Sequence, residues 1–425
     1  MTTLWISARD NLNDRLAEAK DDDQIEYLQF YEMEFSIQIA VLVLQALDRP
    51  YKEVHFRRCR GHVDALVAKI LSRNMVSRLS FFDCIDLDER AVSAIGTCLK
   101  FNTRLTDIRF EEVNPAWADA MARSLGDSLG MNQTLECLLV HEGQFPSESE
   151  SIRCLAYGLF CSRSTSSLKI LHLSNLGLHD ESVADIASAL IDHASLQELS
   201  FSHNNCSGNA MIAIAAMLAS STPLEKLNLS SCCDADNGDD ADASLDLLVL
   251  AEALAKNSRL KRLQLDQNKL DDSAVESLAF TAIVCSQLEQ LDLRSNRITD
   301  RGIKYLATQL SHKNSKTMKK ISLLGNPFGE EGAGYLLEAL EINLDLEFLS
   351  LPGGLECGKI VYHLLHLNKG GRRLLRARDV PLSLWPFALE RVNRLNFWSP
   401  GRINDSCRAN VLFSLLHGPA FLDRT

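Results

Sequence analysis

The sequence predicts an α/β solenoid, a horseshoe with a parallel sheet on its concave side and helices on its convex side. A leucine-spaced segment recurs about every 28 to 30 residues along most of the 425-residue chain. Each copy opens with alternating apolar residues, and its second half has apolar residues at helical spacing. A unit this short cannot bury its apolar face alone, so successive copies must stack on one another.

Three consecutive copies of the repeat begin 28 residues apart. They are Leu168-x-x-Leu171-x-Leu173, Leu196-x-x-Leu199-x-Phe201 and Leu224-x-x-Leu227-x-Leu229. The same frame begins again at Leu260, Leu288, Met318 and Leu346, and on the N-terminal side at Leu135, Leu105, Val76 and, in degenerate form, Tyr51. Eleven units are therefore predicted over residues 51 to 355.

The opening segment of each unit predicts a short strand, because alternation with a period of two places its leucines on one face. A turn follows the strand. The ninth position of the unit is often asparagine or cysteine: Asn204, Asn268, Asn296, Asn326, Cys84 and Cys232. A buried asparagine amide offers two donors and an acceptor, so a stack of such amides is expected to satisfy backbone groups where the chain leaves the strand.

The second half of each unit predicts a helix. Ile303, Leu306 and Leu310 lie on one face at 3.6 residues per turn, and Ala333, Leu336 and Leu340 repeat the arrangement. The order of elements is then strand, turn, helix and return loop. This pattern closely resembles the ribonuclease-inhibitor class of leucine-rich repeats. The resemblance implies a true α-helix on the convex side of each unit.

Three segments are predicted in the chain. Residues 1–50 are expected to form an N-terminal helical cap around the apolar run Ile37 to Leu47, residues 51–358 the solenoid, and residues 359–425 a basic C-terminal cap or extension. The last segment resembles an extension of uncharacterised leucine-rich-repeat proteins of photosynthetic protists. The residues that match that extension are Leu367, Asn368, Gly371, Arg372, Leu375, Leu384, Trp385, Pro386, Leu389 and Arg391. The resemblance implies a family and no activity.

Composition and charge favour a protein of the cytoplasm or nucleus. The twelve cysteines are spread along the chain without a C-x-x-C pair, and no apolar run is long enough to span a membrane. The formal net charge is −12, made of about +7 from residues 359–425 and −19 from the rest. An acidic body disfavours nucleic acid and fits a basic protein partner, although a solvated acidic surface is the simpler interpretation.

Strand positions that point away from the leucines form the predicted binding surface. A charged group near its N-terminal end is the favoured contact patch, and a self-compensating network of ion pairs is the alternative. The patch comprises Arg57, Arg78, Phe82, Asp83, Asp107, Arg109, Glu111 and Glu112. In the C-terminal segment Arg372, Arg373 and Arg376 could bind an acidic or phosphate-bearing partner, or pair with the acidic solenoid.

Two other motifs suggest ligands weakly. The insertion from Asp234 to Asp242 contains five carboxylates, but Gly238 stands where an EF-hand calcium loop needs a ligand. The stretch from Gly353 to Lys359 has the glycine and lysine spacing of a phosphate-binding loop, with Ile360 in place of the serine or threonine that holds magnesium. No cofactor and no metal are therefore expected.

Three functions remain open. A non-enzymatic protein-interaction scaffold leads, because no nucleophile, base and orienting group occur at a recognisable spacing. A regulator of a small GTPase is the second, because Ran GTPase-activating proteins share this repeat class, although the acidic C-terminal tail of that family is replaced here by a basic segment. A nucleotide-binding protein that uses Gly353 to Lys359 is the third.

Overall fold

The computed structural model describes residues 2–370, apart from residues 23, 48, 85–88, 146–149, 233–246 and 313–314. The chain divides into two compact units, Met1–Ala253 (unit 1) and Leu254–Thr425 (unit 2). The predicted C-terminal segment lies outside the described residues from residue 371 onward, and so does the insertion from Asp234 to Asp242.

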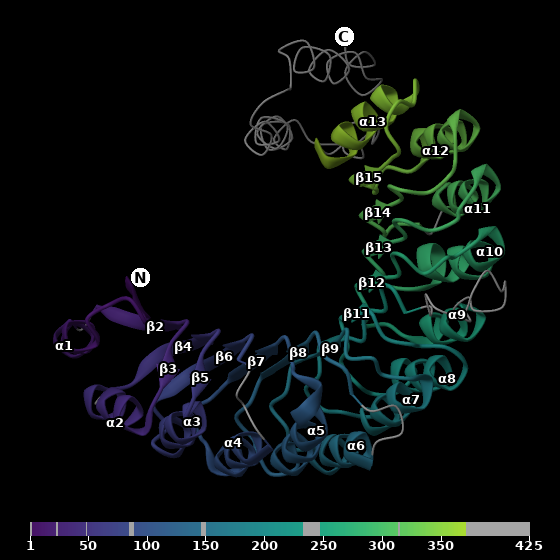
Figure 1. Cartoon of the computed structure of the whole chain (residues 1–425). Helices are drawn as coiled ribbons and strands as arrows, with labels where there is room; N and C mark the ends of the chain where they lie inside the picture. Colours follow the sequence, from purple (N-terminus) through teal and green to yellow (C-terminus); the bar gives the residue numbers. More distant parts are fainter. Residues whose placement is uncertain are drawn as a thin grey trace, which may run out of the picture. The chain divides into compact units, whose positions relative to one another are not determined.

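Unit 1 contains a parallel sheet in which successive repeats supply neighbouring strands (Figure 1). In sheet order the strands are β1 (Thr2–Ser7), β2 (Ile25–Tyr31), β4 (Tyr51–Arg57), β6 (Val76–Phe82), β7 (Asp107–Glu111), β8 (Cys137–His141), β9 (Ile170–Ser174), β10 (Glu198–Ser200) and β11 (Lys226–Asn228). The short strands β3 (Glu34–Phe35) and β5 (Arg60–Gly61) pair separately.

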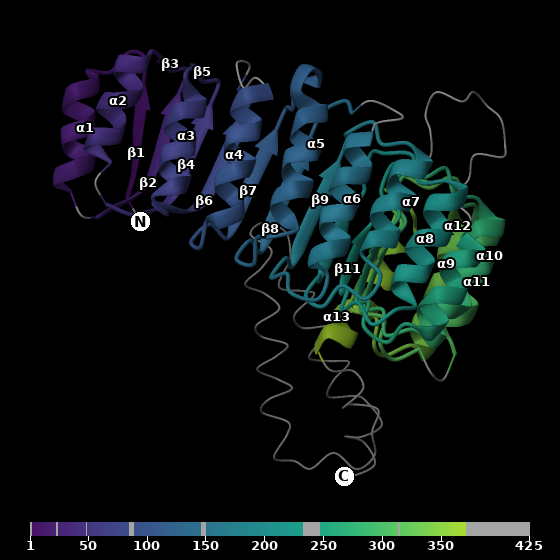
Figure 2. The same ribbon diagram turned by 90° about the horizontal axis from the view of Figure 1, so that it is seen from below.

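A row of helices covers one face of this sheet (Figure 2). The helices are α1 (Leu12–Asp21), α2 (Ile37–Ala46), α3 (Val63–Ser72), α4 (Glu89–Phe101), α5 (Pro115–Leu129), α6 (Glu150–Ser162), α7 (Asp180–Ala189), α8 (Gly208–Leu218) and α9 (Leu247–Lys256), which contains the division between the units. From α3 to α8 each helix packs against the next helix along the chain, as in the pairs α5 with α6 and α7 with α8.

Unit 2 repeats the same plan with shorter strands. Its parallel strands are β12 (Arg262–Gln264), β13 (Gln290–Asp292), β14 (Lys320–Ser322) and β15 (Phe348–Ser350). Its helices are α10 (Asp272–Phe280), continued by a π-helical turn (Thr281–Cys285), then α11 (Asp300–Leu310), α12 (Glu330–Ile342) and α13 (Gly358–Gly370). The predicted leucine-rich-repeat solenoid is confirmed as the fold.

The first 50 residues differ from the helical cap that the sequence suggested. They contain helices α1 and α2, but also strands β1 and β2, which extend the sheet. Leu28 and Phe30 are fully buried and lie in register with Val54 and Phe56 of β4. The repeat frame therefore begins at least one unit earlier, as Ile25-x-x-Leu28-x-Phe30.

The core of the first repeats includes a stack of phenylalanine rings. Phe30, Phe56, Phe81 and Phe110 occupy the same position in successive repeats, and each is at most 2% exposed. Their ring centroids lie 5.3, 5.6 and 5.1 Å apart, with nearly parallel planes. Stacked aromatic pairs of this kind stabilise a core beyond the effect of their buried area.

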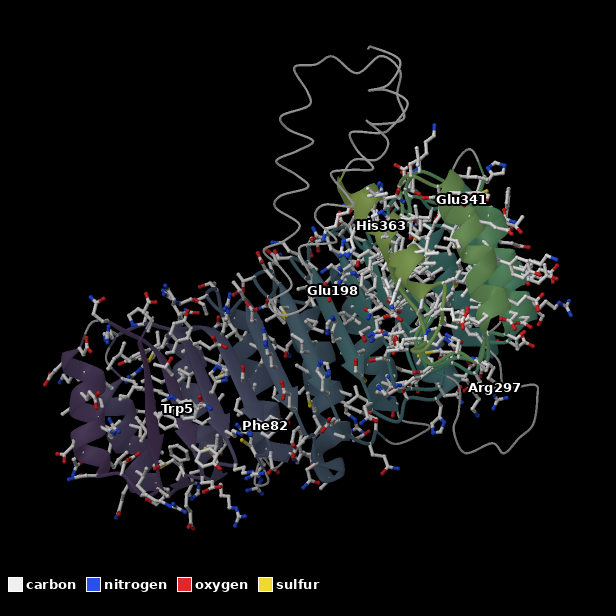
Figure 3. The ribbon with its side chains drawn as sticks, turned by 90° about the horizontal axis from the view of Figure 1, so that it is seen from above. Trp5, Phe82, Glu198, Arg297, Glu341 and His363 are labelled. Carbon is white, nitrogen blue, oxygen red and sulfur yellow. The ribbon has the colours of Figure 1, made fainter. Side chains whose placement is uncertain are left out.

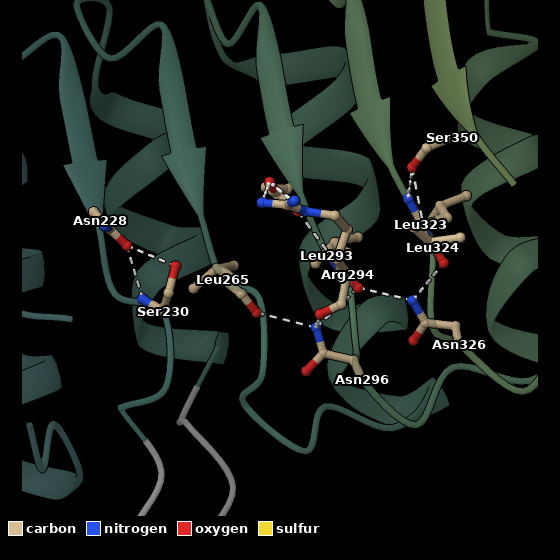
Figure 4. A network of polar contacts seen from close by, with 11 residues as sticks. Asn228, Ser230, Leu265, Leu293, Arg294, Asn296, Leu323, Leu324, Asn326 and Ser350 are labelled. Atoms are coloured by element: carbon tan, nitrogen blue, oxygen red, sulfur yellow. Dashed lines mark hydrogen bonds and ion pairs between the residues drawn. The ribbon is translucent and has the colours of Figure 1, made fainter. Parts of the chain in front are cut away.

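The predicted asparagine turns form hydrogen-bonded ladders (Figure 4). The Asn296 amide nitrogen donates to the carbonyls of Leu265 (3.0 Å) and Leu293 (2.9 Å). Its side-chain oxygen accepts from the backbone amide of Leu270 at 3.1 Å. Asn326 repeats the pattern one unit later, with bonds of 2.8 Å to the carbonyls of Leu293 and Leu323. Each amide therefore joins two successive repeats.

A second asparagine position, at the return loop, was not recognised from the sequence. Asn343 donates to the carbonyl of Leu310 (2.9 Å) and accepts from the amide of Leu346 (2.8 Å), so it joins the end of one helix to the next strand. Asn102 and Asn132 do the same in unit 1. His193 takes this position in one repeat and is fully buried.

Candidate interaction surface

The candidate site is the face of the unit 1 sheet that the helices do not cover, here called the open face. Side chains of a strand alternate between the two faces. In β4, Val54 and Phe56 are buried, and His55 and Arg57 therefore point to the open face. Figure 3 shows Trp5, Phe82 and Glu198 over the strands of unit 1. Parallel register brings equivalent side chains of neighbouring repeats into rows across the sheet.

One such row combines aromatic rings with an arginine. Tyr31, Arg57 and Phe82 are register neighbours on β2, β4 and β6. The Arg57 guanidinium carbon lies 4.7 Å from the centroid of the Phe82 ring and 5.9 Å from that of Tyr31. The cation is thus held between two rings, in a geometry that favours attraction. This set, Tyr31, Arg57 and Phe82, is called the aromatic row.

Trp5 is a further aromatic side chain on the same face. It lies on β1, opposite Gln29 in the register, and its side chain is 52% exposed. Sequence reasoning identified Arg57 and Phe82 but missed Trp5 and Tyr31, because both lie in the segment predicted as a helical cap. The alternation of buried Leu4 and Ile6 with Trp5 was the signal that could have located the strand.

Two of the predicted charged residues, one on β6 and one on β7, contact each other. Arg78 and Asp107 are register neighbours, with 3.7 Å between the Arg78 Nε and an Asp107 carboxylate oxygen. Arg109 is the register neighbour of Ser80, and Glu111 that of Phe82. Of these predicted residues, Glu111 therefore lies beside the aromatic row, Arg109 lies two residues away along the strand, and the pair of Arg78 and Asp107 lies four residues away.

A row of charged turn residues borders the open face. Glu32, Arg58, Asp83, Glu112 and Glu142 each follow a strand and adopt the left-handed conformation, with φ between 48° and 58°. Their backbone amides donate to carbonyls of the next repeat, for example Asp83 to Glu111 at 3.2 Å and Glu112 to His141 at 3.1 Å. These five residues are called the turn row. The bonds hold the conformation in each repeat, despite its cost for residues with a side chain.

The turn row is acidic except at Arg58. Arg58 pairs with Asp83 (3.2 Å) and Glu32 (3.7 Å). A hollow of about 500 Å³ lies here, lined by these three residues together with Met33, Glu34 and Arg60. Partial burial and the neighbouring carboxylates of Asp83 and Glu142 raise the pKa of Glu112. The structure thus brings the predicted Asp83 and Glu112 together and adds Glu32, Arg58 and Glu142.

Farther along the open face the charges are mutually compensated. Glu198 accepts hydrogen bonds from His172 (3.1 Å) and Lys226 (2.6 Å), and these bonds lower its pKa to about 2. The hydroxyls of Ser174 and Ser202 lie 3.0 Å apart, with Ser200 within 3.1 Å of both. These contacts join β9, β10 and β11, so the polar side chains of this part of the face bind one another.

The phosphate-loop motif gains no support. Gly353 and Gly354 lie in the turn after β15, the backbone amide of Glu356 donates to the Glu330 carboxylate, and Ile360 is 54% exposed. The Glu356 amide, which a phosphate in this loop would need as a donor, is therefore bonded to the Glu330 carboxylate. Among residues 2–370 as described, no group of histidine, cysteine and carboxylate side chains could hold a metal ion, and no helix could cross a membrane. The predicted Arg372, Arg373 and Arg376 lie outside the described residues.

Comparison with known proteins supports a leucine-rich-repeat protein. A family model described as a leucine-rich repeat matches residues 284–307. The chain is 27% identical over 277 residues to NACHT, LRR and PYD domains-containing protein 5 of Bos taurus, covering 64% of this chain and 23% of that protein. It is 27% identical over 307 residues to the ribonuclease inhibitor of Sus scrofa, covering 64% and 62%, and 30% identical over 192 residues to that of Mus musculus, covering 44% and 39%.

The chain spans less than two thirds of the length of each of these relatives. Among solved structures, a chain of the yeast Rad7 and Elc1 complex aligns over 81% of this chain and 83% of its own length. That alignment has 16% sequence identity and a TM-score of 0.43.

Proposed function

We propose that this chain is a non-enzymatic protein-interaction scaffold and that the open face between β1 and β7 makes the main contact with its partner. The observation that supports this proposal is the set of Trp5 and the aromatic row on one accessible face. Tryptophan, tyrosine and arginine are enriched among the few residues that dominate the binding energy of protein interfaces. Because Arg57 is already held between two rings, little side-chain entropy is lost on binding.

The partner is expected to be basic where it meets the turn row. Asp83, Glu112 and Glu142 follow one another there, and partial burial together with the other two carboxylates raises the pKa of Glu112. A lysine or arginine of the partner would relieve this repulsion. The same contact would be weakened by salt, because the turn row lies at the solvent-exposed border of the sheet.

The relatives are consistent with a protein partner. The ribonuclease inhibitors are named for their action on an enzyme, which is itself a protein. Residence in the cytoplasm or nucleus, the family resemblance of the C-terminal extension and the boundary at residue 358 stay predictions.

The proposal is tested by affinity capture with two matched variants. Phe82→Ala removes a ring of the aromatic row, whereas Phe348→Ala removes an exposed ring from the strand β15 of unit 2. A partner that binds the intact chain and the Phe348→Ala variant, but is lost with Phe82→Ala, is the expected result. Equal capture by both variants would remove the open face of unit 1 as the main contact.

Regulation of a small GTPase stays a separate prediction, based on the repeat class alone. It is tested by measuring GTP hydrolysis by candidate GTPases with and without the protein. Nucleotide binding at Gly353 to Lys359 is tested by calorimetric titration with ATP and GTP, for which no binding heat is expected, since Glu330 already occupies the Glu356 amide.

A further inference from the structure

A second surface lies on the opposite side of unit 1, where the helices cover the sheet. A groove of about 1050 Å³ follows one face of α6, which contributes Glu150, Arg153, Tyr157 and Cys161. Helices α5 and α7 border it. Because a helix rises about 1.5 Å per residue, the stretch from Glu150 to Cys161 extends about 16 Å. This length suits roughly three turns of a partner helix.

The groove arises where α5 and α6 pack unusually close together. A Cβ atom added to Gly158 would lie 1.9 Å from the carbonyl oxygen of Gly126, and one added to Gly126 would lie 2.3 Å from that of Cys154. These two positions therefore require glycine. The close contact removes side chains from the junction of the two helices, and Gly126, Gly130 and Gly158 all border the groove.

Large apolar side chains lie exposed at this groove. The Tyr157 side chain is 70% exposed and that of Met131 is 56% exposed, and both line it. Close by, Phe160 on α6 is 45% exposed and is covered in part by the Arg163 guanidinium, whose carbon lies 4.1 Å from the ring centroid. A patch of exposed large apolar side chains on a soluble protein is typical of an interaction site.

The charge of the groove is negative. Four carboxylates line it, those of Asp127, Glu150, Glu181 and Asp185. Two cations compensate them in part, since Lys100 lies 3.6 Å from Asp127 and Arg153 lies 3.6 Å from Asp185. Four negative and two positive charges leave a net charge of −2, supplied by Glu150 and Glu181 at the N-terminal ends of α6 and α7.

We propose that this groove binds a basic amphipathic helix of a protein partner. The apolar side of that helix contacts Tyr157 and Met131, and its lysine or arginine side chains face Glu150 and Glu181. An amphipathic helix laid in a groove is a common mode of peptide recognition. The groove and the open face lie on opposite sides of the sheet, so the scaffold has a second contact that does not depend on the first.

The test is a fluorescence-anisotropy titration of the full chain with synthetic helical peptides. The probe is a labelled lysine, leucine and alanine peptide of roughly 18 residues, with leucines at helical spacing. One control peptide has the same composition in scrambled order, and another has glutamate in place of lysine. The protein variants are Tyr157→Ala and Glu181→Lys in the groove.

Two variants outside the groove serve as matched controls. Ile342→Ala removes an exposed apolar side chain, 61% exposed, at the end of α12. Glu331→Lys reverses a charge in the first turn of α12, and Glu181 has the corresponding place in the first turn of α7. All four substitutions are at the surface, and circular dichroism verifies that each variant is folded.

The expected result is that the patterned lysine peptide binds, and that Tyr157→Ala and Glu181→Lys each weaken its binding about tenfold while the control variants leave it unchanged. Three results would overturn the proposal: no binding of the patterned peptide, equal binding of the scrambled peptide, or equal weakening by the control variants. The last two would indicate non-specific attraction to an acidic chain. None of these outcomes bears on the open face, which the Phe82 and Phe348 variants test.

Discussion

The first repeats of unit 1 and the repeats of unit 2 fill two equivalent positions with different chemistry. At the sixth position unit 1 has Phe56, Phe81 and Phe110, whereas unit 2 has leucines such as Leu293 and Leu323. At the ninth position unit 1 has Cys59 and Cys84 and unit 2 has Asn268, Asn296 and Asn326. Both regions have a core of buried aliphatic side chains, to which the first adds stacked rings and the second adds amide hydrogen bonds at the turn after the strand. The same fold thus has two different sources of cohesion beyond its aliphatic core.

The two regions differ on the open face as well. Strands β4 and β6 have seven residues each, whereas β12 to β15 have three. A longer strand presents more outward side chains to a partner. The aromatic row lies on β4, β6 and the equally long β2, in the region where we propose that the partner binds.

The largest effect is expected from Phe81→Ala. Phe81 lies in the middle of the ring stack, so its removal leaves a cavity between Phe56 and Phe110. The free energy of unfolding should fall by about 4 kcal/mol, measured by urea denaturation. A loss below about 1 kcal/mol would show that the stack does not stabilise these repeats.

Asn296→Ala should come next, with a loss of about 3 kcal/mol. The substitution leaves the carbonyls of Leu265 and Leu293 and the amide of Leu270 without their buried partner. Cys84→Ala is the matched variant in unit 1. Its thiol donates only a weak bond, 3.4 Å to the carbonyl of Phe56, so its loss should cost about 1 kcal/mol. Equal losses of unfolding free energy for the two variants would show that asparagine and cysteine stabilise this turn equally, and that the two regions do not differ in this respect.

His193 should make stability depend on pH. Burial lowers its pKa to about 4, from 6.5 in the unfolded chain, because removal from water disfavours the charged form of the ring. The unfolded state therefore binds more protons below pH 6.5, so stability falls as the pH falls, by about 2 kcal/mol between pH 7 and pH 5.

His193→Asn provides the control for this pH dependence. It introduces the residue that Asn343 supplies in unit 2, and it should abolish this part of the pH dependence when unfolding is measured at both pH values. An unchanged difference between pH 7 and pH 5 would assign the effect to other groups.

Substitution of Trp5 should have the smallest effect on stability. Its side chain lies on the open face and is 52% exposed, so Trp5→Ala should change the free energy of unfolding by less than about 1 kcal/mol. Partner binding should nevertheless weaken. A loss of stability comparable to that of Phe81→Ala would make Trp5 a core residue.

The sequence predicted the repeated plan well, because leucines at fixed spacing report directly on burial. The asparagine ladder was also correctly predicted, from the hydrogen-bonding capacity of the amide. The repeat at Ile25 was missed although Ile25, Leu28 and Phe30 fit its frame, because residues 1–50 were interpreted as a helical cap around the apolar run Ile37 to Leu47. Trp5 and Tyr31 lie in the same segment and were missed with it. The contact of Gly126 with Gly158 joins residues 32 positions apart, and no local pattern marks it. The turn row depends on backbone φ angles, which residue types such as glutamate do not indicate.

Hydroxyl-radical footprinting of the chain with and without its captured partner tests the central claim most directly. Oxidation of Trp5, Tyr31 and Phe82 reports on the open face of unit 1, and oxidation of Phe348 reports on the exposed strand of unit 2 within the same molecule. We expect the partner to protect Trp5, Tyr31 and Phe82 and to leave Phe348 as reactive as before. Protection of Phe348 with no change at Trp5 and Phe82 would contradict the assignment of binding to unit 1.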